Sequence, residues 1–63
     1  MNDIKNLNRV PDHVVINAIH RRFGAETAAA IIADMWWSPL NGCWFFTHSG
    51  MLHGCETDGY IHT

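Results

Sequence analysis

The sequence predicts a small α+β domain in which two short helices precede a small antiparallel β-hairpin or three-stranded meander. In the first half of the chain, apolar residues recur at the spacing of one helix face. Pro39 and the Asn41-Gly42 pair then end the helical pattern. The remainder is aromatic and contains two hairpin-turn signals, Ser49-Gly50 and Asp58-Gly59.

A chain of 63 residues forms one domain at most, and its composition is that of a folded protein. We expect an N-terminal arm at residues 1–10, a helical pair at 11–37 and antiparallel strands at 43–63. Charged residues make up 16% of the chain, below the roughly 25% typical of soluble domains. Part of the surface must therefore be apolar or aromatic, and in a small protein such a surface is often an interaction site.

The first helix is expected over residues 12–23 and the second over residues 25–37. Pro11 and Asp12 suit a helix start, because proline lacks an N–H that would have no partner there and aspartate caps the others. Gly24 suits a left-handed stop between the helices. Alanine, the strongest helix former, recurs in the second helix. The expected buried stripe of that helix is Ala28, Ile31, Ile32, Met35 and Trp36.

Strands are expected at residues 43–48, 51–57 and 60–63, with two-residue loops between them. Directly paired side chains share a face of a sheet. One face then carries Trp44, Phe46, His48, Met51, His53, Cys55, Tyr60 and His62, and the other carries Cys43, Phe45, Thr47, Leu52, Gly54, Glu56 and Ile61. We expect the second face to pack against the helices and the first to point outward. A register slip of one residue would exchange the faces.

Three residues of the expected outward face are candidate metal ligands: His53, Cys55 and His62, with His48 at the edge. Zinc takes cysteine and histidine ligands in tetrahedral arrays. However, the pattern C-x4-H-x4-H-x-C-x6-H lacks the C-x2-C pair that accompanies an H-x3–5-H pair in typical zinc sites. We therefore expect no metal and no cofactor, and keep a small Cys/His metal-stabilised domain as an alternative.

The sequence contains no recognisable catalytic motif. Cys55 and His62 are expected to be neighbours, and a thiolate–imidazole pair is a nucleophile. A chain this short has little room for a substrate pocket and an oxyanion hole as well. Cys43 and Cys55 are expected on opposite faces, which disfavours a disulfide. We expect a protein that is not an enzyme.

A helical pair before a hairpin resembles a helix-turn-helix or winged-helix DNA-binding regulator, which is the first alternative function. In such a protein residues 25–37 would read the DNA, yet this segment contains Glu26 and Asp34 and neither lysine nor arginine. The chain has a formal net charge of −2 and lacks the basic surplus that phosphate binding uses. Nucleic acid is therefore not expected as a direct ligand.

The aromatic residues are the remaining functional signal. Trp36 and Trp37 cannot both face one core from a single helix, so Trp37 is expected at the surface. Tryptophan and tyrosine are common anchors of protein interfaces. The residues expected to contact a protein partner are Trp37, Trp44, Phe46, Tyr60, Glu26, Asp34, Glu56 and Asp58.

The whole-chain profile resembles small phage- or mobile-element-encoded inhibitors of bacterial defence systems, such as anti-CRISPR proteins. The shared features are short length, mild acidity, many aromatic residues, and no export signal or catalytic motif. The resemblance implies stoichiometric binding to a protein partner such as a CRISPR–Cas surveillance complex. Acidic side chains would engage basic nucleic-acid channels there. It also implies a location in the cytoplasm of the bacterial host. No apolar run approaches the roughly 20 residues that span a bilayer, so no membrane partner is expected.

Overall fold

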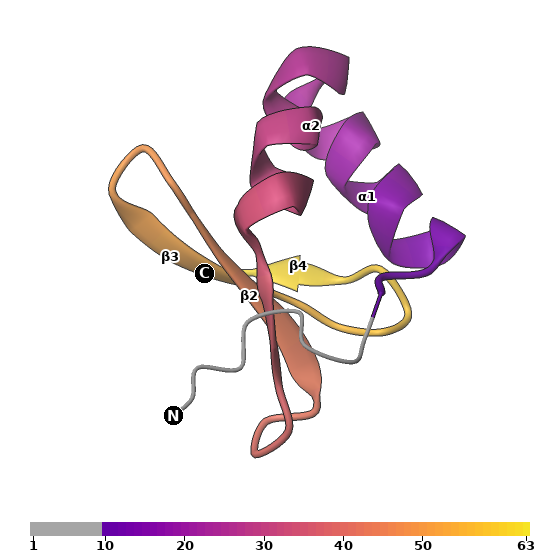
Figure 1. Ribbon diagram of the computed structural model, residues 1–63, viewed down its shortest axis with the longest axis vertical. Helices are drawn as coiled ribbons and strands as arrows, with labels where there is room; N and C mark the ends of the chain where they lie inside the picture. The colour runs from indigo at the N-terminus through magenta and orange to yellow at the C-terminus, as the bar shows by residue number, and fades with distance from the viewer. Residues whose placement is uncertain (1–9) are drawn as a thin grey trace.

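The computed structural model describes residues 10–63, and within them two helices are followed by a four-stranded antiparallel sheet (Figure 1). The strands lie in the sheet in chain order. The elements are α1 (His13–Phe23), α2 (Ala25–Asp34), β1 (Trp36–Ser38), β2 (Cys43–His48), β3 (Met51–Cys55) and β4 (Ile61–His62). The α+β class predicted from the sequence is confirmed, with one strand more than expected. The expected arm at 1–10 lies outside the described residues except for Val10, which is exposed.

The start of α1 follows the predicted capping signal. The carboxylate Oδ1 of Asp12 accepts hydrogen bonds from the backbone N–H groups of Val14 and Val15, at 3.1 and 3.3 Å. These donors have no partner within the helix, so the cap satisfies them. Gly24 alone joins the two helices, with a φ of +87° that other residues rarely adopt.

Replacing Asp12 by alanine is expected to lower the free energy of unfolding by about 1 kcal/mol, because two helix-terminal N–H groups lose their acceptor. Urea unfolding followed by circular dichroism measures this change. The Asp12→Ser variant keeps a capping oxygen and should remain within a few tenths of a kcal/mol of the parent. Equal stability of the serine and alanine variants would contradict a capping role.

The second helix is shorter than predicted. It ends at Asp34, and Met35 is already extended, with φ −73° and ψ 159°. The expected helical residues Trp36 and Trp37 instead form β1, which pairs with β2. Large aromatic residues fit the pleated surface of a sheet, where each can contact a ring on the neighbouring strand. This pairing prevails over the helical tendency of the preceding alanines.

Ring contacts across the β1–β2 pair illustrate that preference. Trp36 lies opposite Phe45, with ring centroids 6.1 Å apart, and Trp37 lies opposite Trp44, at 5.4 Å. Adjacent tryptophans therefore point to opposite faces of the sheet, which resolves the conflict that two neighbouring indole rings would create on a helix.

The β2–β3 hairpin has the predicted two-residue loop and the predicted register. Ser49 and Gly50 both have positive φ, +54° and +78°, as the type I′ turn requires. His48 pairs with Met51 and Phe46 pairs with His53. This part of the prediction is confirmed in full.

The β3–β4 register differs from the prediction by one residue. His62 pairs with Gly54, not with Cys55. The loop has three residues between Glu56 and Tyr60, because the Gly59 N–H donates to the Glu56 carbonyl at 2.9 Å and the Glu56 N–H donates to the Tyr60 carbonyl at 2.8 Å. Gly59 has a φ of +96°, the conformation of the bulge residue that follows a type I turn in such loops.

The faces of β2 and β3 are exchanged relative to the prediction, whereas β4 keeps its predicted orientation because of the register shift. Trp44 and Phe46, expected to point outward, are each 1% exposed and lie in the core with the helices. Phe45 and Leu52, expected in the core, lie on the opposite face, where Leu52 is 51% exposed. The observed orientation buries two large rings and leaves the Thr47 hydroxyl in water, whereas the reverse would desolvate it.

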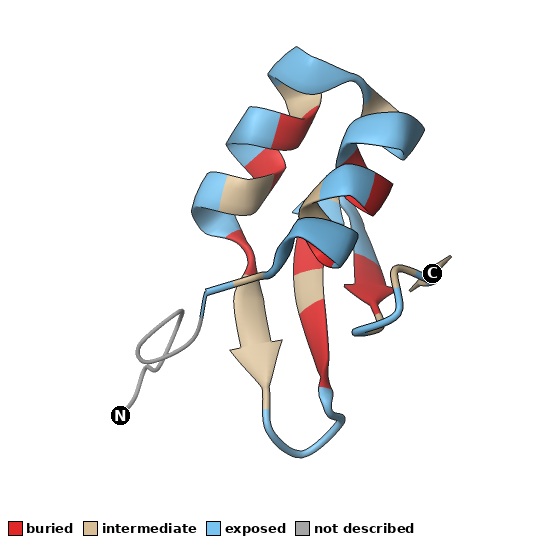
Figure 2. Cartoon of the chain, turned by 90° about the vertical axis from the view of Figure 1, so that its right-hand side faces the viewer, coloured by how far each residue is buried: buried red, intermediate tan, exposed pale blue. Residues whose placement is uncertain are grey.

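The core lies between the two helices and one face of the sheet, and Figure 2 shows the buried segments of the helices and strands. Small residues on the helices allow close approach to the large rings of β2. The core residues are Val15, Ile19, Ala28, Ile31, Met35, Trp44, Phe46 and Cys55.

Candidate functional site

The face of the sheet opposite the helices, here called the open face, is a surface that the two helices leave uncovered. Neither helix lies on it. The strand pairing and the side-chain contacts place ten residues there: Trp36, Ser38, Cys43, Phe45, Thr47, Leu52, Gly54, Glu56, Tyr60 and His62. Apolar and aromatic groups thus share this face with a thiol, a carboxylate and an imidazole.

The apolar part of the open face combines rings with an exposed aliphatic side chain. Trp36 and Phe45 are half-buried and in contact with each other. Leu52 on β3 is 51% exposed, and Tyr60 before β4 is 64% exposed. The Tyr60 ring stacks on the ring of His62, with centroids 6.0 Å apart. These side chains form an aromatic surface that a partner could contact.

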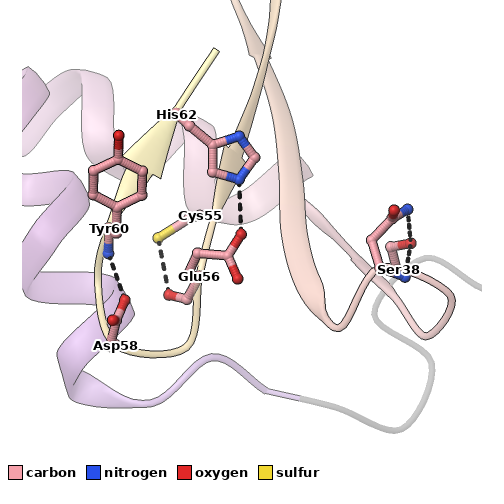
Figure 3. Close-up of polar contacts among 7 residues, drawn as sticks. Ser38, Cys55, Glu56, Asp58, Tyr60 and His62 are labelled. Atoms are coloured by element: carbon pink, nitrogen blue, oxygen red, sulfur yellow. Dashed lines mark hydrogen bonds and ion pairs between the residues drawn. The ribbon is translucent and has the colours of Figure 1, made fainter.

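The polar part of the open face is centred on His62. Its Nε2 lies 2.8 Å from Oε2 of Glu56, and Figure 3 shows the two side chains turned towards each other. The side chains of His62 and Glu56 are 36% and 42% exposed. Cys43, only 2% exposed, contributes a sulfur close to both. The three groups bring together nitrogen, oxygen and sulfur donors at one place.

The two cysteines are free thiols on opposite faces of the sheet, as predicted. Burial raises the pKa of Cys55 from 9.0 to about 11, and the Glu56 carboxylate adds to the effect. Burial, followed by the same carboxylate, also raises the pKa of Cys43. Neither thiol therefore has the lowered pKa that makes a cysteine a nucleophile at neutral pH.

The three metal candidates chosen from the sequence do not come together. His53 and Cys55 are buried on the helix side of the sheet, whereas His62 lies on the open face. Instead, among the described residues, His62 meets Cys43 and Glu56. The predicted two-residue loop at 58–59 puts those two side chains on a common face but His62 on the other. The signal that would have found it is Gly59, which suits a bulge as well as a type I′ turn.

His53, expected at the surface, is 8% exposed and stacks on Phe46 with ring centroids 5.3 Å apart. Phe23 meets the same imidazole edge-on at 6.0 Å. The His53 Nδ1 is buried without a hydrogen-bond partner among the described residues. This histidine therefore serves as a core ring, packed by its aromatic neighbours.

Two of the residues predicted to contact a partner are in the core. Trp44 and Phe46 are buried, so neither can contact a partner on the described fold. Trp37 is half-buried and packs against the core beside Trp44. Tyr60 is exposed as predicted.

The four predicted acidic contacts lie on two separate elements. Glu26 and Asp34 are exposed near the two ends of α2. Glu56 and Asp58 lie at the loop before β4, where the Asp58 Oδ1 accepts a hydrogen bond from the Tyr60 N–H at 3.0 Å (Figure 3). Glu56 therefore belongs to the open face and Asp58 lies in the adjoining loop, whereas the acidic residues of α2 do not belong to it.

A groove runs beside the same loop. It is lined by Ala18, Arg21, Arg22, Gly59, Tyr60 and Ile61. Both arginines belong to the last turn of α1, where the partial negative charge of the helix end favours cations. Tyr60 thus lies between a cationic groove and the open face.

None of the helices in residues 10–63 is long and apolar enough to cross a membrane. Comparisons of the chain with protein-family models, with curated proteins and with solved structures found no match.

Proposed function

We propose that the protein is a non-catalytic inhibitor that binds a protein partner stoichiometrically, in the manner of anti-CRISPR proteins. The observation that carries this proposal is the open face, where Leu52 and Tyr60 are more than half exposed beside the half-buried rings of Trp36 and Phe45. Exposed apolar and aromatic side chains on one face often mark a binding site, and aromatic side chains supply much of the energy of protein interfaces.

The partner we propose is a bacterial defence complex such as a CRISPR–Cas surveillance complex. Glu56 lies on the open face and Asp58 in the loop that follows it, so carboxylates lie beside its apolar side chains. A rim of one charge favours encounter with a surface of the opposite charge. A channel that binds nucleic acid is such a surface, because it is basic. Occupation of that channel would prevent recognition of target DNA.

A DNA-binding role has less support from the same surface. Helix α2 carries Glu26 and Asp34 and no cation, and its buried side packs against the sheet. Among residues 10–63 the only lysine or arginine side chains are Arg21 and Arg22, against five carboxylates. Phosphate neutralisation supplies most of the affinity of DNA-binding proteins, and this balance opposes it.

The Leu52→Asp variant is expected to lose inhibition, because a charge inside a desolvated apolar contact is left without a partner. We measure target-DNA binding by a purified surveillance complex with increasing amounts of each variant. The loss should be about 30-fold or more in effective concentration, which corresponds to an interface hot spot of about 2 kcal/mol.

Met51→Asp is the matched control. Met51 precedes Leu52 in β3 and is exposed to nearly the same extent, 53%, but its side chain points to the other face. It should inhibit like the parent protein. Equal loss in both variants, or no inhibition by the parent protein, would contradict the proposed binding face.

A further inference from the structure

The polar part of the open face has the composition of a metal site. One ligand atom from each of Cys43, Glu56 and His62 lies within 4.8 Å of the other two. Cys43 begins β2, Glu56 follows β3 and His62 lies in β4, so the pairing of three strands holds the donors together. Their positions in the sheet come from backbone pairing and do not depend on an ion.

We propose that Cys43, Glu56 and His62 bind one zinc ion, with the fourth coordination position open to solvent. Sulfur, imidazole nitrogen and carboxylate oxygen are the three donor types that zinc uses in proteins, and three protein ligands leave one position for water. A thiolate donor favours zinc over the harder ions Mg²⁺ and Ca²⁺. The argument for this site does not rest on the proposed partner binding, although both use Glu56.

The distances are within reach of tetrahedral coordination. Zinc bonds of 2.0–2.3 Å place ligand atoms about 3.3–3.7 Å apart. The Glu56 and His62 ligand atoms, now 2.8 Å apart, would separate slightly without a full change of rotamer. The Cys43 sulfur would move closer to them from its present position within 4.8 Å. Cys43 is buried and fixes one corner, whereas the other two side chains are partly exposed and can rotate.

Gly54 makes room for the histidine. It lies opposite His62 in the β3–β4 pair, and a methyl group there would overlap the imidazole, with Nε2 only 2.7 Å from the added carbon. Glycine within a strand is unfavourable and often marks a close approach by another group. At Gly54 that group is the His62 ring, which the missing side chain allows to lie next to the strand and beside Glu56.

Charge supports the same assignment. A thiolate at Cys43 and the Glu56 carboxylate together balance the two positive charges of zinc, and neutral His62 completes the set. A chain of 63 residues also has a small core, and structural metals commonly stabilise domains of this size.

The test uses untagged full-length protein stripped with a chelator and titrated with Zn²⁺ against a chromophoric competitor. We expect one zinc ion per chain, and a melting temperature raised by about 10 °C or more when free zinc is about 100-fold above the dissociation constant. Cobalt as a probe should give a sulfur-to-metal charge-transfer band. Cys43→Ser should abolish this band and weaken zinc binding by about 100-fold or more. This loss exceeds that typical of residues that only hydrogen-bond to a metal ligand.

Two further variants make the result decisive. Gly54→Ala keeps all three donors but displaces the His62 ring, so it should weaken zinc binding by about 10-fold or more while the apo circular dichroism stays unchanged. His20→Gln removes an exposed histidine of α1 and should bind zinc like the parent. Parent-like affinity in both Cys43→Ser and Gly54→Ala, or a loss of affinity in His20→Gln, would overturn the site.

Discussion

The Trp44→Ala variant is expected to be largely unfolded at room temperature. Trp44 is 1% exposed, belongs to the core cluster and contacts the ring of Trp37. Replacing a buried tryptophan by alanine typically lowers the free energy of unfolding by about 3–5 kcal/mol. A single core in a domain of this length supplies roughly the same amount, about 3–5 kcal/mol. One substitution therefore removes most of the stability.

Urea unfolding followed by circular dichroism, together with the dispersion of amide NMR signals, measures that loss. Tyr60→Ala is the control, because it also removes an aromatic ring but from a side chain that is 64% exposed. Its effect on stability should stay below about 1 kcal/mol. Equal stability of the two variants would contradict the burial of Trp44 in the core.

In the presence of a chelator, the free energy of unfolding is expected to fall as the pH rises from 9.0 towards about 11. Burial, and after it the Glu56 and Asp58 carboxylates, raise the pKa of the Cys55 thiol to about 11 in the folded protein. Above its ordinary pKa of 9.0 the unfolded chain releases this proton while the folded chain keeps it. The unfolded state is then favoured, so stability is fully present below pH 9.0 and is lost above it.

The contribution of Cys55 is isolated by comparing urea midpoints of the parent and Cys55→Ala across this pH range. Tyrosine and lysine titrate in the same region and affect both proteins, whereas only the parent contains the core thiol. The parent should lose more stability than the variant between pH 9.0 and about 11. Parallel curves would show that this thiol does not govern the alkaline transition.

Local signals predicted the parts of the fold that depend on a few neighbouring residues. The Asp12 cap, the Gly24 stop and the Ser49-Gly50 turn all act within one turn of chain, and each lies where the sequence places it. The predicted end of α2 was wrong, because Trp36 and Trp37 gain ring contacts with a strand that lies further along the chain. A local sequence pattern carries no information on tertiary pairing of this kind.

The orientation of the sheet could not be derived from alternation alone. Both faces of β2 carry large rings, so a period of two identifies which side chains share a face but not which face meets the helices. Cys43 and Glu56 were correctly assigned to one face for this reason. His62 was assigned to the other, because a loop longer by one residue reverses the direction of every side chain after it.

The brevity of the two outer strands limits how this protein can associate. Within residues 10–63, β1 and β4 form the margins of the sheet and contain three and two residues. An added strand gains most of its affinity from main-chain hydrogen bonds along such a margin, and these margins offer few. Growth of the sheet by addition of a strand from another chain is therefore disfavoured, and contact through side chains becomes the main route to assembly.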